Sequence, residues 1–128
     1  MRTEEKETKT RYGTVNFEKR KHPRFSVDLP VEYSRANLSA DRGRAMNASE
    51  GGLLLYLPEQ IGIGNHLRLK LFFTVGSELD AVETLVEVVW VDIHLEKGWE
   101  DYRTGVRFVE ISPEEMGKLR SFLKSLSG

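Results

Sequence analysis

The chain of 128 residues contains no cysteine and no long apolar run, and both absences limit what kind of protein it can be. Without cysteine it cannot form a disulfide, a thiolate nucleophile or a cysteine-ligated zinc site. No stretch approaches the roughly 18 consecutive apolar residues of a membrane helix. Residues 1–17 also lack the apolar segment of a secretory signal. We therefore expect a cytoplasmic protein that does not insert into a membrane.

Sequence patterns of common enzyme sites are missing as well. The three histidines, His22, His66 and His94, are scattered rather than spaced as metal ligands from one element. There is no Gly-x-Ser-x-Gly elbow and no Walker-type phosphate loop. The segment GIGNH, residues 62–66, is too short for a dinucleotide fingerprint. We predict that the protein is not an enzyme and that it has no metal site and no cofactor.

The net charge is only −1, but the charge is divided unevenly along the chain. Residues 1–24 hold eight Lys and Arg against four Asp and Glu, and residues 25–128 hold eleven against sixteen. The length suits one domain. We interpret residues 1–17, which are charged and poor in apolar residues, as a flexible tail, and residues 18–128 as the domain. An acidic domain disfavours long nucleic acids, so a bound anion should be small.

Apolar periodicity predicts a small antiparallel β-barrel of six strands, plugged or flanked by one C-terminal helix. Pro30 interrupts the first alternating segment on its polar side, which predicts an edge position or a bulge. We expect the segment WEDY, residues 99–102, to form a hairpin tip before the last strand. The predicted strands cover residues 25–34, 38–49, 52–57, 66–75, 81–95 and 102–111.

The helix is predicted from its first residues and from its apolar stripe. Ser112 fits an N-cap, Pro113 the first helical position and Glu115 a capping box. Apolar residues at helical spacing then form one face that should pack against the barrel. The residues of that face are Met116, Leu119, Phe122, Leu123 and Leu126.

Two short motifs carry the functional signal. The hexamer RKHPRF, residues 20–25, fits Arg-x-x-x-Arg through Arg20 and Arg24; alone it is either a solvated linker or a clamp for an anion. The hexamer NASEGG fits Asp/Asn-x-Ser-x-x-Gly through Asn47, Ser49 and Gly52; alone it is also a common turn sequence.

Together these motifs, with GVRF at residues 105–108 and the terminal helix, resemble the PilZ domain family of bacterial cyclic di-GMP receptors over about residues 18–126. The resemblance implies a six-stranded PilZ-type barrel with ligand between the arginine loop and the barrel surface. It implies that Arg20 and Arg24 grip phosphates and guanine edges, that Asn47 and Ser49 contact guanine, and that Gly52 permits the turn. Candidates for accessory contacts are Lys19, Lys21 and Arg107.

The chemistry of cyclic di-GMP suits these residue types. Its two phosphodiesters and two guanines match the forked donors of arginine, and an Asn amide offers both a donor and an acceptor to a base edge. We predict a receptor or adaptor in signal transduction, whose arginine loop closes on the ligand and alters a surface read by a protein partner. One alternative is a PilZ-fold interaction module that binds no nucleotide, as in type IV pilus assembly, and another is a barrel that binds single-stranded RNA. The number of ligands, one or an intercalated pair, stays open, as do the oligomeric state and the regulated process.

Overall fold

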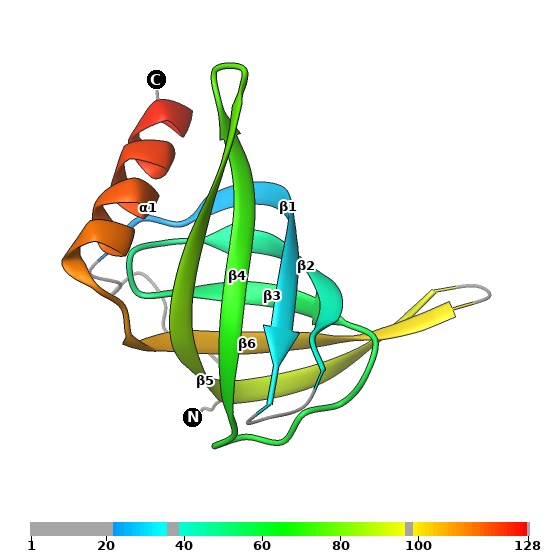
Figure 1. Ribbon diagram of the computed structural model, residues 1–128. Helices are drawn as coiled ribbons and strands as arrows, with labels where there is room; N and C mark the ends of the chain where they lie inside the picture. Colours follow the sequence, from blue (N-terminus) through cyan, green and yellow to red (C-terminus); the bar gives the residue numbers. More distant parts are fainter. Residues whose placement is uncertain (1–21, 36–38, 97–98, 128) are drawn as a thin grey trace, which may run out of the picture.

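The computed structural model describes residues 22–35, 39–96 and 99–127, and this part of the chain folds as a closed barrel with one flanking helix (Figure 1). All strand pairs are antiparallel, in the order β1-β2-β3-β6-β5-β4 around the barrel. The predicted fold is confirmed. The elements are β1 (Phe25–Ser34), β2 (Asp41–Ala48), β3 (Gly52–Leu57), β4 (His66–Val75), β5 (Glu78–Glu96), β6 (Trp99–Glu110) and α1 (Pro113–Leu126).

The inside of the barrel is filled by alternate residues of the strands. In β4, for example, Leu67, Leu69, Leu71 and Phe73 are all buried, while the residues between them face outward or are half-buried. Val31 on β1, which lies opposite Leu71, is buried too. Apolar residues therefore alternate along the strands because every second side chain packs into the one core inside the barrel.

Pro30 lies where the ladders of β1 change. The register between β1 and β2 shifts between Ser26 and Leu29, and pairing of β1 with β4 begins only at Val31. Pro30 thus lies beside a bulge and outside the β4 ladder, where its missing N–H leaves no bond of that ladder unfilled. Of the two alternatives expected from the sequence, the bulge is present, whereas β1 is not an edge strand because the barrel is closed.

The segment WEDY is not a hairpin tip, and that prediction is wrong. β5 continues to Glu96, which pairs with Trp99, so residues 99–102 already belong to β6. Beyond the barrel, β5 and β6 continue as a two-stranded arm that projects from the body, coloured yellow in Figure 1. The strand predicted over residues 38–49 is shorter than expected, because β2 covers only Asp41–Ala48.

α1 begins with the predicted cap, and Leu119, Phe122 and Leu123 of its predicted apolar face are buried. Met116 is half-buried, whereas Leu126 at the end of the helix is 43% exposed, so the packing prediction is wrong for Leu126. The side chain of Ser112 accepts a hydrogen bond from the Glu115 N–H at 3.1 Å, and Pro113 opens the helix. The buried stripe rests on the barrel, where the rings of Phe122 and Phe73 stack with centroids 4.5 Å apart. Within the described ranges, no helix is long and apolar enough to cross a membrane.

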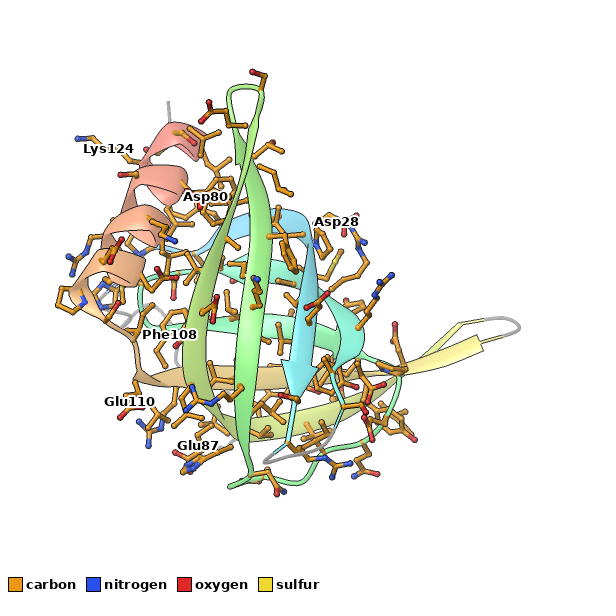
Figure 2. All side chains as sticks on the ribbon, in the orientation of Figure 1. Asp28, Asp80, Glu87, Phe108, Glu110 and Lys124 are labelled. Carbon is orange, nitrogen blue, oxygen red and sulfur yellow. The ribbon has the colours of Figure 1, made fainter. Side chains whose placement is uncertain are left out.

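Polar contacts complete the attachment of α1 to β5. Glu115 accepts the backbone N–H of Glu83 at 2.7 Å, and Lys118 donates to the carbonyl of Ala81 at 2.9 Å. Lys118 also lies 3.7 Å from Asp80, which is seen beside the helix in Figure 2. The helix is therefore fixed to the barrel by its apolar stripe and by hydrogen bonds to a strand backbone.

Candidate functional site

Strand pairing places the second motif in a row of residues that crosses the outside of the barrel. Residues directly opposite one another on neighbouring strands point to the same face of a sheet. Asn47 lies opposite Ser26 on one side and opposite Leu54 on the other. Continuing across β6 and β5, the complete row is Ser26, Asn47, Leu54, Gly105 and Trp90.

A second row lies beside the first. Arg107 on β6 is opposite Gly52 on β3 and opposite Glu87 on β5, and Glu87 is opposite His66 on β4. The guanidinium of Arg107 forms an ion pair with the Glu87 carboxylate. Arg107 is exposed, as predicted from its position between Val106 and Phe108. The second row thus contributes one cation and its counterion to the same face.

A cavity of about 260 Å³ opens where these rows meet the start of β1. Arg24 from the first motif and Ser49 and Gly52 from the second motif line it, together with Trp90 and Arg107. The structure therefore brings together two motifs that are 23 residues apart in the sequence, counted from Arg24 to Asn47. A larger cavity, about 470 Å³, contains neither motif, so we assign the site by its chemistry rather than by its size.

The turn of the second motif is held by its own serine. The Oγ of Ser49 accepts the Gly51 N–H at 3.1 Å, and the Ser49 N–H donates to the Gly52 carbonyl at 3.0 Å. Phe108 on β6 donates its N–H to the Gly51 carbonyl at 3.2 Å, which ties the turn to the barrel. The Ser49 hydroxyl thus stabilises the turn; a contact with guanine stays a prediction.

Gly52 is required by close packing rather than by an unusual backbone angle. A Cβ at this position would lie 2.1 Å from the carbonyl oxygen of Val106 and 3.1 Å from the Cα of Arg107. The glycines with positive φ in the described ranges are Gly64 and Gly76. The motif glycine therefore allows β3 to approach β6, whereas the resemblance implied a role in the turn itself.

Trp90 is a site residue that sequence reasoning missed. Its alternation with Val86 and Val88 favours an inward position unless a bulge intervenes. The β5–β6 register does shift between Val88 and Trp90, and this shift turns the indole outward. There the ring lies over Gly105, because a Cβ on that glycine would be 2.2 Å from the indole Nε1. The side chain keeps 41% of its surface exposed. No local pattern marks this position; only the register with β6 reveals it.

The remaining predicted site residues fall into two groups. Lys19, Arg20 and Lys21 lie outside the described residues. Asn47 is half-buried and does not line the cavity itself, but its cross-strand neighbour Leu54 does. Among the residues that the structure describes, no group of three or more His, Asp or Glu side chains is arranged to hold a metal ion.

The turn also contacts α1 from its other side. Glu50, the residue between Ser49 and Gly51, pairs with Arg120 of α1, with the guanidinium Nε 2.8 Å from the carboxylate. Glu50 and Arg120 line a second cavity, of about 470 Å³, together with Pro23 and Phe25. The segment around residues 22–25 and the motif turn therefore separate the candidate site from the face of α1.

Comparison with known proteins gives the same fold and a family. The sequence model of the PilZ domain matches residues 18–125. No curated protein sequence matches the chain. The Bacillus subtilis inhibitor of motility MotI/DgrA is 18% identical with a TM-score of 0.74, over 87% of this chain and 52% of its own.

Two further similar structures are described as complexes with c-di-GMP. The PilZ domain of YcgR from Escherichia coli, with c-di-GMP, is 18% identical with a TM-score of 0.69, over 86% of this chain and 92% of its own. The c-di-GMP complex of MrkH from K. pneumonia is 16% identical with a TM-score of 0.70, over 86% of this chain and 52% of its own. The chain thus spans about half the length of MotI/DgrA and MrkH. Such identities establish the fold alone, whereas the domain match covers most of the sequence, so the chain belongs to the PilZ domain family.

Proposed function

We propose that the protein is a receptor for cyclic di-GMP, which binds in the cavity between the start of β1 and the turn of the second motif. The observation that carries the proposal is the meeting of Arg24 with Ser49 and Gly52 at one cavity. Family membership supports it, since YcgR and MrkH of the same fold are described with c-di-GMP.

The charge of the cavity suits an anion. Its ionisable lining residues are His22, Arg24 and Arg107, and none of its lining residues is an acid. This contrasts with residues 25–128, which carry five more acidic than basic side chains. An arginine fork can bind two phosphate oxygens, or O6 and N7 of guanine, in a bidentate manner. In the proposal, Arg20 and Arg24 bind phosphate and guanine edges, with Arg107, Lys19 and Lys21 as accessory cations.

Trp90 gives the site a surface for a base. Its indole is held over Gly105 and is partly exposed at the cavity. Stacking of a base on an aromatic ring contributes about 1–3 kcal/mol and needs little more than a free ring face. We assign guanine stacking to Trp90 and base-edge hydrogen bonds to Asn47, whose neighbour Leu54 lines the same cavity.

The cavity is small for a dinucleotide. Its volume of about 260 Å³ lies just below the usual range of ligand sites, which is about 300–1,000 Å³. In our proposal residues before His22, including Arg20, complete the site when they close over the ligand. A segment that closes over a ligand loses conformational freedom, so part of the binding energy is spent on closure.

The proposed output is a change at the face of α1, read by a protein partner, and not a catalytic step. His22 and Arg24 line the ligand cavity, while Pro23 and Phe25 line the second cavity beside Arg120. A ligand that moves His22 and Arg24 therefore also moves the wall of the second cavity. The Glu50–Arg120 ion pair links the motif turn to the same helix.

Isothermal titration calorimetry tests the proposal, with cyclic di-GMP, GTP and a short RNA as ligands. We expect cyclic di-GMP to bind with micromolar affinity or better, about −8 kcal/mol, and the stoichiometry to distinguish one ligand from an intercalated pair. Arg24→Lys keeps the charge but removes the fork, so binding should weaken more than lost charge explains. Arg68→Lys, on β4 outside this cavity, is the matched control and should bind like the wild type.

One result would contradict the receptor assignment: the absence of binding heat with cyclic di-GMP, which would favour an interaction module that binds no nucleotide. A second result would contradict only the bidentate role of Arg24: an Arg24→Lys protein that binds as tightly as the wild type.

A further inference from the structure

Arg107 lines the candidate site and also forms an ion pair with Glu87, an acid outside the cavity. Its Nη2 donates to the Oε1 of Glu87 on the neighbouring strand. Glu87 itself is not part of the cavity wall. A negative charge is therefore in contact with a cation of the site, although no acidic residue lines the cavity. Figure 2 shows Glu87 on the outer surface of the barrel.

The pair is fixed by the sheet more firmly than most surface ion pairs. Glu87 and Arg107 are directly opposite each other in the β5–β6 ladder, so backbone pairing sets their approach. The Glu87 side chain is only 25% exposed, against 57% for Arg107. Solvent screens a partly covered carboxylate less than a fully exposed one, so its field reaches the guanidinium and whatever that guanidinium binds.

We propose that Glu87 sets the affinity of the site for anions by competing with the ligand phosphates for Arg107. This rests on the proposed function. The arginine guanidinium has five N–H donors. Glu87 accepts a hydrogen bond from Nη2 of Arg107, and the remaining N–H groups can donate to a phosphate. A phosphate held there lies near a like charge, which opposes binding in proportion to the charge of the ligand. Glu87 therefore orients Arg107 and lowers the affinity at the same time.

Glu87→Gln separates these two effects. The amide keeps an acceptor for Arg107 and removes only the charge. We expect cyclic di-GMP to bind about 3- to 10-fold more tightly, as removal of one partly screened charge beside a bound phosphate should give. Glu87→Asp keeps the charge and should stay close to the wild type.

The β5–β6 ladder supplies a matched control. Asp92 and Arg103 are also opposite each other and form an ion pair at 2.5 Å, but neither lines the cavity. Asp92→Asn thus removes an acid of the same ladder without touching the site. Its affinity for cyclic di-GMP should equal that of the wild type.

The experiment is a calorimetric titration of cyclic di-GMP into the wild type, Glu87→Gln, Glu87→Asp and Asp92→Asn at low and high salt. The gain of Glu87→Gln should shrink as salt rises, because it comes from a screened charge; a change in packing alone would not depend on salt in this way. Unchanged or weaker binding of Glu87→Gln, with a wild type that binds, overturns this inference and leaves the receptor assignment standing. A wild type that does not bind overturns the proposed function and this inference with it.

Discussion

Replacement of Gly52 by alanine tests whether the motif glycine is required by strand packing. The added Cβ would lie 2.1 Å from the Val106 carbonyl oxygen, and Cβ atoms essentially never come within 3.0 Å of such a neighbour. Val106 and Arg107 cannot retreat freely, because they pair with Val88 and Glu87 on their other side. Overpacking of this kind costs about 1–3 kcal/mol and sometimes more, and a clash with backbone belongs at the upper end.

The expected loss can be read from thermal unfolding. About 3 kcal/mol in a domain of this size should lower Tm by about 10 °C. Gly117→Ala is the matched control, since an added Cβ there meets no atom within 4 Å and the residue lies inside α1. It should raise stability by about 0.5–1 kcal/mol, because alanine is the better helix former. A Gly52→Ala protein that melts with the wild type would refute the packing argument.

Three further changes test separate parts of the structure. Gly105→Ala would place a Cβ 2.2 Å from the Trp90 Nε1, so we expect the exposed indole to swing aside, with a smaller loss of Tm than Gly52→Ala, altered tryptophan emission and weaker cyclic di-GMP binding. The backbone N–H of Glu83 and then Lys118 lower the pKa of Glu115. The stability this gives is present above the ordinary glutamate pKa and is lost as the pH falls through the lowered pKa, so Glu115→Gln should flatten the decline in Tm as the pH falls below about 5. Tyr33→Phe removes a hydrogen bond donated to Glu59 at 2.8 Å and should cost about 1 kcal/mol in urea unfolding.

The strands that could be predicted from sequence are those with one face in the core. β1, β3 and β4 have the predicted ends, because their alternating or continuous apolar residues are imposed by burial. The error at residues 99–102 has the opposite cause. Trp99, Glu100 and Asp101 pair only with β5, the other strand of the arm, and pairing of β6 with β3 begins at Tyr102. No core face therefore imposes a period of two on most of this segment.

The site was only partly predictable for a related reason. Each motif is one short continuous segment of the sequence, so Arg24, Ser49 and Gly52 could be predicted as site residues from the sequence alone. The structure then places all three at one cavity. Trp90 and Glu87 could not be predicted in this way, since their place depends on a register shift and on a cross-strand pairing between distant residues. Arg20, Lys19 and Lys21 stay predictions, as they lie outside the described residues.

A small closed barrel must carry a ligand site on its outside, because side chains fill its interior. The outer face of a sheet is normally covered by side chains as well, and a hollow forms where they are missing. Here the lining includes Gly51, Gly52 and Gly105, and the close approach of β3 to β6 prevents a side chain at Gly52. The glycines thus shape the hollow, while Arg24, Trp90 and Arg107 give it charge and an aromatic face. Replacement by alanine should therefore act mainly on stability at Gly52 and mainly on ligand binding at Gly105, although both glycines belong to one site.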